Sequence, residues 1–398
     1  MWCDIVLVKK KRLKLRLIIL SVLLCFLFGC FSEPYNIPKS MPERVKIVFV
    51  VPLSDMNSRE GVPAKNAFLQ AVNQANESER FPYYIEPVII KETTDTAAMG
   101  TALLNALSGN DVFAVCGYWY SENVAAAIPV LREKKVPLLI WGAVGTELVS
   151  VKNLPYVTRI CPVAEQSLEL LYAFTAGKIS EEKWFVVSDS SSYGRSNAKL
   201  FNELIDSHNA VKLGQFTLPS DKKQGDFTAL VQAIKTASPS AIYFGGLAEN
   251  LPGLRQALYE AGLGQLPFAT SAGTSLANIA DTSDIMNGVY TVNYGTNVNL
   301  QWGTRFMDDY RQANYSELPG VFTGFAYDAA MVIVQALENI LLLGDGVPTP
   351  KKIAEEIAGI NCPGLLGEIS FDEKGQAPDY NTIFRPFVMR NGQWTETK

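Results

Sequence analysis

The chain has 398 residues, of which 48% are hydrophobic and 19% are charged, so its composition is that of a folded globular protein. Its length exceeds that of one typical α/β core and predicts two lobes. The formal charge is −5, and residues 1–29 hold six of the 35 basic side chains but only one of the 40 acidic ones. The remaining chain is more acidic still, which argues against a nucleic-acid-binding protein. His208 is the only histidine, so neither a metal centre nor a histidine general base is expected.

Residues 1–29 have the pattern of an export signal. A basic stretch at 9–16 precedes an apolar run at 17–28 that is too short to cross a bilayer comfortably. The run ends in Leu-Phe-Gly-Cys30, which resembles the bacterial lipobox, in which the cysteine is lipidated and becomes the first mature residue. We predict a signal peptide over 1–29, lipidation at Cys30 and a tether over 30–44. An uncleaved membrane anchor is the alternative, and both interpretations place the body of the protein outside the cytoplasmic membrane.

Strands and helices alternate from residue 45 onward. Short apolar runs predict strands at 45–51, 84–91, 112–116, 136–141, 184–188, 211–217, 241–244, 267–270, 288–292 and 384–389. Helical spacing of apolar residues predicts helices at 64–74, 96–108, after 121, and at 167–176, 193–205, 227–236, 254–261, 302–314, 322–343 and 351–358. Such alternation predicts an α/β fold with parallel sheets covered on both faces. The pattern restarts after a short link at 155–161, where a second lobe is expected.

The segment 111–146 shows the repeating unit most clearly, as a strand, a helix and a second strand. Ser121 is predicted to cap the helix, because its hydroxyl can accept a bond from an N–H of the first turn. A connection of this length implies parallel strands and a right-handed crossover. The loops at 118–121 and 142–146 then lie at one sheet edge, where open α/β sheets bind ligands.

Several short stretches follow one another in a recognisable order. They are Val-Pro-Leu-Ser at 51–54, the loop at 117–121, Ser-Ser-Ser-Tyr-Gly at 190–194, the segment 225–235, Tyr-Phe-Gly-Gly at 243–246 and the segment 367–375. Together, over residues 45–394, they resemble the periplasmic branched-chain amino-acid binding proteins, the type I solute receptors of ABC importers. The resemblance implies two Rossmann-like lobes joined by three hinge crossings, which close on a solute. It places lobe 1 at 45–158 plus 294–361 and lobe 2 at 159–293 plus 362–398, with crossings near 158–161, 292–294 and 361–364.

The same resemblance implies a set of binding residues in the cleft. A serine hydroxyl and backbone N–H groups hold the ligand's carboxylate in that family, and Ser121, Gly142 and Val144 stand at those positions. Tyr193 and Phe322 match aromatic residues of the pocket; a surface tyrosine and a buried packing residue are the structural alternatives. Four aromatic residues are candidates for a wall suited to stacking or to a cation, and two of the four are expected to reach the cleft. They are Tyr118, Trp119, Tyr120 and Trp141.

Three positions depart from the family's pattern. The acidic residue that binds the ammonium of an amino acid is replaced by Ala272, a nearby tyrosine by Leu247, and a threonine by Val144. Burying an unpaired ammonium is unfavourable, so either Glu60 or Glu249 substitutes, or the ligand has no α-ammonium. Glu60 is expected in a loop at 55–61, where a solvated charge is the favoured interpretation. We therefore expect a solute other than a standard branched-chain amino acid, for example an aromatic or amide-like compound.

The positions of the cysteines and the absence of catalytic motifs narrow the possible functions. Cys161 and Cys362 both fall near predicted crossings and are hypothesised to pair, and three buried thiols including Cys116 are the alternative. The sequence contains no G-x-S-x-G, H-E-x-x-H, Cys-x-x-Cys or phosphate-loop motif. We expect neither an enzyme nor a cofactor.

Two functions remain. The favoured one is a lipid-anchored, extracytoplasmic solute receptor that docks on the membrane subunits of an ABC permease. The alternative is a non-transport lipoprotein on the same fold, similar to the activators of cell-wall synthases, that acts through a protein interface. A hydrolase is a distant third.

Overall fold

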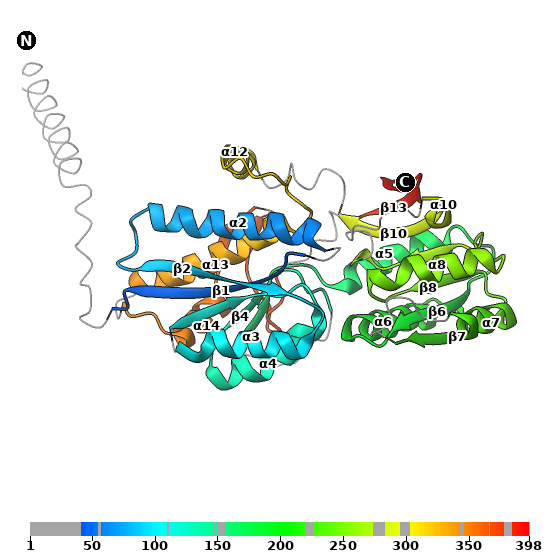
Figure 1. Cartoon of the computed structure of the whole chain (residues 1–398), viewed down its shortest axis with the longest axis horizontal. Helices are drawn as coiled ribbons and strands as arrows, with labels where there is room; N and C mark the ends of the chain where they lie inside the picture. The colour runs from blue at the N-terminus through cyan, green and yellow to red at the C-terminus, as the bar shows by residue number, and fades with distance from the viewer. Residues whose placement is uncertain are drawn as a thin grey trace, which may run out of the picture. The chain divides into compact units, whose positions relative to one another are not determined.

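The computed structural model describes residues 41–54, 57–109, 111–145, 148–149, 156–219, 227–273, 283–294, 303–342, 346–365, 367–377 and 384–397. The predicted signal peptide, Cys30 and most of the tether lie outside these residues. The described elements build two sheets of five and seven strands, together with a short two-stranded one (Figure 1). We call the five-stranded sheet with its helices lobe 1, and the seven-stranded sheet with its helices lobe 2.

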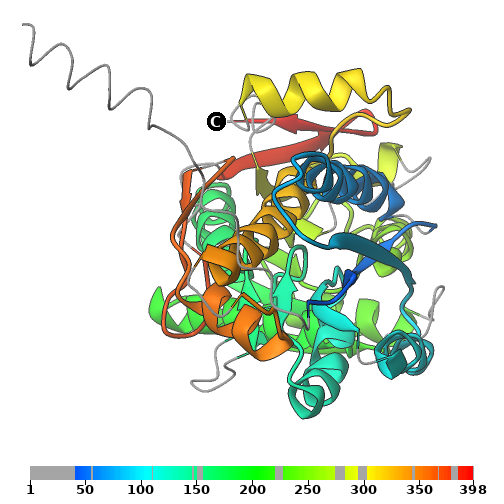
Figure 2. The ribbon, with the colours of Figure 1, turned by 90° about the vertical axis from the view of Figure 1, so that its left-hand side faces the viewer.

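The sheet of lobe 1 is parallel throughout, in the order β2-β1-β3-β4-β5. Its strands are β1 Arg44–Pro52, β2 Tyr84–Glu92, β3 Val112–Cys116, β4 Leu138–Ile140 and β5 Val157–Arg159. Its helices are α2 Ser58–Glu77, α3 Thr96–Ala106 with the short turn η1 Leu107–Gly109, α4 Ser121–Lys134, α12 Thr304–Gln312, α13 Thr323–Leu342 and α14 Pro350–Ala358. Figures 1 and 2 show α2 beside α13, and Figure 1 shows α3 and α4 across the sheet from them. Helices on both sides explain why β1 is apolar and buried from Ile47 to its end.

Helix α13 is long and apolar enough to span a membrane. It is the one such helix among the described residues, and 67% of its most apolar window is buried inside the protein. It packs against α2 and α14. We therefore assign it to the core of lobe 1.

The sheet of lobe 2 has the order β14-β13-β10-β9-β8-β6-β7. Its strands are β6 Lys183–Asp189, β7 Val211–Leu218, β8 Ala241–Phe244, β9 Phe268–Thr270, β10 Val289–Tyr294, β13 Phe384–Arg390 and β14 Gln393–Glu396. Its helices are α5 Ala164–Ala176, α6 Ser192–Ser207, α7 Thr228–Ala237, η3 Ala248–Asn250, α8 Leu251–Glu260 and α10 Ser283–Met286. The last two strands are antiparallel and form a hairpin, whose turn residues Asn391 and Gly392 both have positive φ.

Strand β6 shows how lobe 2 divides its apolar residues between two faces. Trp184 and Val186 pack in one buried cluster, with α5 and α6, whereas Phe185 and Val187 pack in the other, with α7 and α8. Successive residues of a strand point to opposite faces, so an unbroken apolar run fills two cores at once. The parallel α/β architecture predicted from the sequence is confirmed.

Along the chain, the described elements pass from one lobe to the other three times. These crossings lie between β5 and α5, between β10 and α12, and between α14 and β13. The third crossing contains the two-stranded sheet of β11 Cys362–Gly364 and β12 Gly367–Ile369. It runs beside the first, where Arg159 pairs with Gln376 in a parallel bridge. The first and third segments that connect the lobes therefore lie side by side.

One predicted boundary was wrong in a way that affects the site. The sequence predicted a loop up to residue 61, but α2 begins at Ser58 and includes Glu60. The carboxylate of Glu60 accepts a hydrogen bond of 2.9 Å from the backbone N–H of Phe322, far along the chain. A partner 262 residues away leaves no trace in the local sequence pattern.

Candidate functional site

A cavity of about 480 Å³ lies between the two lobes. Lobe 1 lines it with the loops that follow β2, β3 and β4, and lobe 2 with those that follow β6, β8 and β9. The predicted loops at 118–121 and 142–146 do meet at one sheet edge, because β3 and β4 are parallel neighbours. Of the candidate binding residues named from the sequence, eight line the cavity. They are Trp119, Tyr120, Ser121, Gly142, Val144, Tyr193, Glu249 and Phe322.

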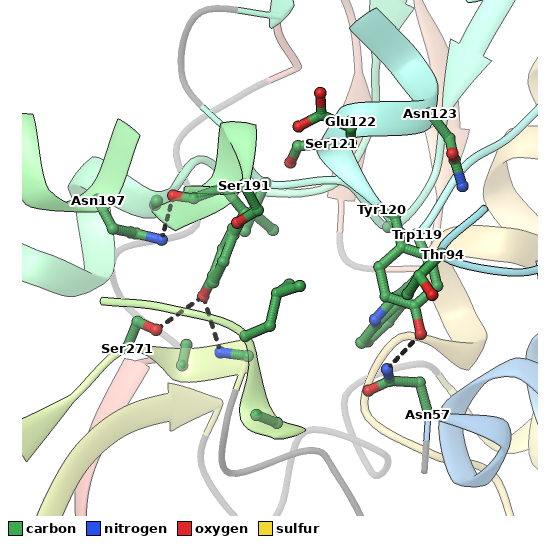
Figure 3. Close-up of a pocket in the computed structure, with 18 of the residues that line it drawn as sticks. Asn57, Thr94, Trp119, Tyr120, Ser121, Glu122, Asn123, Ser191, Asn197 and Ser271 are labelled. Atoms are coloured by element: carbon green, nitrogen blue, oxygen red, sulfur yellow. Dashed lines mark hydrogen bonds between the residues drawn. The ribbon is translucent and has the colours of Figure 1, made fainter. Parts of the chain in front are cut away.

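Ser121 is the first residue of α4, not its cap. Tyr120 occupies the capping position, and no side chain caps this helix. The hydroxyl of Ser121 is buried and has no hydrogen-bond partner among the described residues. Figure 3 shows it directed toward the side of the cavity that carries Ser191. A polar side chain that is buried without a partner is unfavourable, so this hydroxyl is suited to a bound molecule.

The loop before α4 is held in place by Glu92, a fully buried residue that sequence reasoning missed. Its carboxylate accepts from the backbone N–H groups of Trp119 and Tyr120, at 2.8 and 3.1 Å. It also accepts from the side-chain amide of Asn123 at 2.9 Å. The one sequence signal was an acidic residue directly after the predicted strand at 84–91.

Two of the four candidate aromatic residues reach the cavity, and Tyr118, which was expected to bind the ligand, is not one of them. Trp119 and Tyr120 line the cavity, whereas Tyr118 and Trp141 are buried in the core and are absent from its described lining. The indole N–H of Trp141 donates to the carbonyl of Val50 at 3.0 Å, which fixes it within the sheet.

Trp119 is held by its neighbours. Its ring lies 5.1 Å from that of Phe322 in an edge-to-face arrangement. A Cβ atom on Gly142 would come within 2.9 Å of the Trp119 ring, so the indole occupies the space that a side chain at 142 would need. Tyr120 is fixed separately, because its hydroxyl accepts from the amide of Asn57 at 2.9 Å (Figure 3).

Arg159 supports the same wall from behind. Its guanidinium donates to the carbonyls of Ala143 and Gly145, at 3.3 and 2.6 Å, and to the side chain of Gln376 at 2.6 Å. Burial lowers the pKa of Arg159 to about 10, which leaves it charged at neutral pH. Arg159 thus connects the cavity loop to the segments that join the lobes.

Tyr193 forms the wall of lobe 2, but its hydroxyl is already engaged. It donates to Ser271 at 2.9 Å and accepts from the backbone N–H of Gly273 at 3.3 Å. Burial raises the pKa of the Tyr193 phenol, so it stays neutral. Tyr193 therefore presents its ring, not its hydroxyl, to the cavity.

Asp189 organises the loops of lobe 2 much as Glu92 organises those of lobe 1. It is fully buried at the end of β6 and accepts from the backbone N–H and the hydroxyl of Ser191. It also accepts from the backbone N–H of Leu247 and the side-chain amide of Asn250. The start of α6 and the segment after β8 are fixed by this one carboxylate.

Glu60 does not belong to the described lining of the cavity, and the interpretation of a solvated loop charge was wrong. Its side chain is buried beneath the 320–322 segment, where a Cβ atom on Gly320 would meet it at 2.5 Å. Burial raises the pKa of Glu60 to about 7, against the opposing effect of its hydrogen bond from Phe322. Glu60 positions Phe322, which does line the cavity.

The hypothesised disulfide is absent. Cys116, Cys161 and Cys362 are all free and buried. The thiol of Cys161 lies 3.7 Å from the carbonyl of Ala143, whereas Cys362 pairs with Ile369 in the two-stranded sheet. The part of the chain that the structure describes also contains no cluster of three acidic, histidine or cysteine residues suited to a metal ion.

Residues 44–387 match the family described as periplasmic binding proteins. The chain belongs to the periplasmic binding protein family. This is a family of solute receptors and not of enzymes, and the match covers most of both lobes.

Two curated relatives are branched-chain amino-acid receptors by name. This periplasmic binding protein is 22% identical over 342 residues to the leucine-, isoleucine-, valine-, threonine- and alanine-binding protein of Pseudomonas aeruginosa, covering 85% of this chain and 88% of that one. It is 24% identical over 306 residues to a Leu/Ile/Val-binding protein homologue of Brucella melitensis, covering 73% and 77%.

Solved structures show the same fold. The leucine-binding protein of Thermotoga maritima superposes with a TM-score of 0.72 at 20% identity, over 89% of this chain and 98% of that one. A solute-binding protein of Rhodopseudomonas palustris, in complex with 4-hydroxybenzoate, gives the same TM-score at 16% identity, over 89% and 96%. The predicted type I fold with two lobes is confirmed.

The three departures from the family's pattern all line the cavity of this periplasmic binding protein. Val144 lies on lobe 1, and Leu247 and Ala272 lie on lobe 2. Glu249 also lines it, whereas Glu60 is not among the described lining.

Proposed function

We propose that this periplasmic binding protein is the extracytoplasmic solute receptor of an ABC importer and captures a small organic molecule between its lobes. The observation that carries the proposal is the cavity, which both lobes line at the carboxyl ends of their strands. Its volume of about 480 Å³ lies within the usual range for ligand pockets. Side chains do not fill it.

The start of α4 supplies the polar contacts on lobe 1. N–H groups in the first turn of a helix have no intrahelical acceptor and favour an anion or another acceptor. The Ser121 hydroxyl has no partner in the part of the chain that the structure describes, and together with these N–H groups it is suited to a carboxylate or carbonyl group of the solute. Trp119, Tyr120 and Phe322 would cover its apolar part. Gly142, Val144 and Tyr193 complete the proposed wall.

The proposal includes a lipid anchor and a permease. Lipidation at Cys30 would hold the receptor at a membrane surface, and closure around a solute would create the form that docks on the permease subunits. The support is the basic and apolar pattern of residues 1–29 and the lipobox-like motif. Labelling with a radioactive fatty acid tests the anchor: wild type should incorporate the label and Cys30→Ala should not.

The alternative, a lipoprotein that acts through a protein interface, has one observation in its favour. Val144, Leu247 and Ala272 place apolar side chains where amino-acid receptors of the family bind an ammonium group. The cavity favours the receptor, because the Ser121 hydroxyl at its wall, which lacks a partner within the described ranges, is suited to a bound molecule.

Screening against a solute panel tests the receptor function. Purified protein is heated with amino acids, aromatic acids, amines and amides, and compounds that raise its melting temperature are measured by calorimetry. A receptor should bind at least one compound and become more compact in solution scattering. Absence of binding by every class would overturn the proposal, and a clear preference for leucine would contradict the expected change of solute.

A further inference from the structure

We infer that Arg159 couples the binding of the solute to the movement of the lobes. Arg159 is a positioning residue: it is absent from the described lining of the cavity, but it holds the loop after β4, which is part of the wall, and ties this loop to the first and third crossings. The inference rests on the proposed receptor function and adds a residue that sequence reasoning did not single out.

The loop after β4 directs three successive carbonyl groups away from the cavity wall. Those of Ala143 and Gly145 accept from the guanidinium of Arg159, at 3.3 and 2.6 Å. The carbonyl of Val144, between them, accepts from the backbone N–H of Ala164 at 2.9 Å. Arg159 is the last residue of β5, where the first crossing begins, so the orientation of this loop depends on the crossing.

The opposite side of the same peptide groups is available to a solute. In a trans peptide unit the C=O and N–H bonds point in opposite directions, so the N–H groups of Val144 and Gly145 point away from the donors that hold the carbonyls. Neither N–H group has an acceptor among the residues that the structure describes. Val144 lines the cavity, and a Cβ atom on Gly145 would lie 2.8 Å from the hydroxyl oxygen of Ser121. Adjacent N–H groups of this kind are suited to an anion or another acceptor.

The charge of Arg159 favours the same orientation. Its side chain is buried, and within the described ranges its hydrogen bonds all go to neutral oxygens, those of Ala143, Gly145 and Gln376. A buried cation polarises the peptide groups bonded to it, which strengthens the hydrogen bonds that their N–H groups can donate. Arg159 thus prepares the loop beside Ser121 for an acceptor group of the solute.

The other side of Arg159 joins the two crossings. Its Nε donates to the side-chain oxygen of Gln376 at 2.6 Å, and the amide of Gln376 donates to the carbonyl of Cys161 at 3.1 Å. The backbone of Arg159 donates to the carbonyl of Gly375 at 2.8 Å and accepts from the N–H of Ala377 at 2.9 Å. A shift of the crossings during hinge closure therefore moves the guanidinium and, with it, the carbonyls of the loop. By linkage, a solute that binds the oriented loop stabilises the closed arrangement of the lobes.

A second buried arginine provides a matched control. Arg255 of α8 in lobe 2 donates to the backbone carbonyls of Ile285 and Gly264, at 3.0 and 3.2 Å, and is absent from the described lining of the cavity. Arg159→Lys and Arg255→Lys each replace a planar set of donors by one ammonium group, so both should lower the melting temperature of the full-length protein.

Only Arg159→Lys should also change binding and movement. The probe is the compound that wild type binds most tightly among the amino acids, aromatic acids, amines and amides of the solute panel. Its affinity should fall about tenfold or more in Arg159→Lys and stay within about twofold in Arg255→Lys. Spin labels on Arg132→Cys and Lys212→Cys, exposed on lobes 1 and 2, should show a broader distance distribution in solute-free Arg159→Lys and an unchanged one in Arg255→Lys.

A second variant applies if Arg159→Lys does not fold. Gln376→Ala removes the side chain that joins Arg159 to the third crossing and leaves the contacts with Ala143 and Gly145 in place. It should give the same two changes, with affinity reduced about threefold or more.

Each outcome decides the question. Weaker binding together with a broader distance distribution, in Arg159→Lys but not in Arg255→Lys, supports the coupling. If either quantity in Arg159→Lys equals that of wild type, or if Arg255→Lys loses as much affinity, the inference is wrong while the receptor function stands. If wild type binds no compound of the panel, the receptor function fails and the inference fails with it.

Discussion

The carboxylate of Glu122 in lobe 1 accepts a hydrogen bond of 2.6 Å from the backbone N–H of Ser192 in lobe 2. Glu122 is the second residue of α4 and Ser192 is the first residue of α6, so the contact joins the starts of two helices that belong to different sheets. The positive end of α6 favours a carboxylate at this point. The pair therefore stabilises the arrangement in which the lobes enclose the cavity.

Replacing Glu122 by alanine should shift the free protein toward an open form. A hydrogen bond to a charged acceptor contributes about 1–2 kcal/mol, so the ratio of open to closed protein should rise roughly 5- to 30-fold. Spin labels on Arg132→Cys and Lys212→Cys, exposed on lobes 1 and 2, would report the distance distribution. The same labels on a Glu133→Ala background serve as the control. An unchanged distribution in Glu122→Ala would show that the contact does not hold the lobes.

Two serines at helix starts should differ in their response to replacement by alanine: one variant should lose stability and the other should lose affinity for the solute. The hydroxyl of Ser191 accepts from the N–H of Gly194 at 2.9 Å and caps α6, so Ser191→Ala should lower the free energy of unfolding by about 1 kcal/mol. The hydroxyl of Ser121 has no described partner, so Ser121→Ala should leave unfolding nearly unchanged. Affinity for the solute should instead fall about tenfold in Ser121→Ala. Chemical denaturation and calorimetry measure the two effects, and a marked loss of stability in Ser121→Ala would argue for a structural role.

A methyl group at Gly142 should disturb the aromatic wall. A Cβ atom there would lie 2.9 Å from the Trp119 ring, so Gly142→Ala should displace the indole and weaken solute binding about tenfold or more. Gly100 in α3 has no atom within 4 Å of an added Cβ, so Gly100→Ala should stabilise the protein by about 0.5–1 kcal/mol and leave binding unchanged. Tryptophan fluorescence and calorimetry compare the pair. Equal behaviour of the two variants would refute the proposed role of position 142.

Stability should fall as the pH rises from about 4.5 to 7. The pKa of Glu60 is raised from 4.5 to about 7 by burial, so the folded state binds more protons than the unfolded state in this window. The effect is complete above pH 7 and amounts to at most about 3 kcal/mol. Asp328, whose pKa burial also raises to about 7, contributes in the same direction.

Glu60→Gln should therefore remove part, but not all, of this pH dependence. Its amide oxygen can still accept from the N–H of Phe322, so the fold should persist. Urea denaturation at several pH values gives the slope, and Glu203→Gln, at an exposed site on α6, is the matched control. A slope in Glu60→Gln equal to that of wild type would mean that burial does not raise the pKa of Glu60 in the folded protein.

The sequence alone determined the architecture and the edge at which the site lies. Apolar runs such as the one in β1 and the helical spacing after residue 121 depend on neighbours within a few residues, so their periods are visible locally. Parallel strands joined by a helix must bring their following loops to the same edge, which is why the loops at 118–121 and 142–146 could be placed together.

Only the tertiary structure decided what each side chain does there. It separated Trp119 from Trp141, left the hydroxyl of Ser121 without a partner among the described residues, buried Glu60 beneath Phe322 and kept Cys161 apart from Cys362. Each outcome depends on contacts between residues tens to hundreds of positions apart, or on a loop whose direction packing sets. A local pattern predicts where a chain turns, but the burial and partner of a side chain are properties of the packed whole.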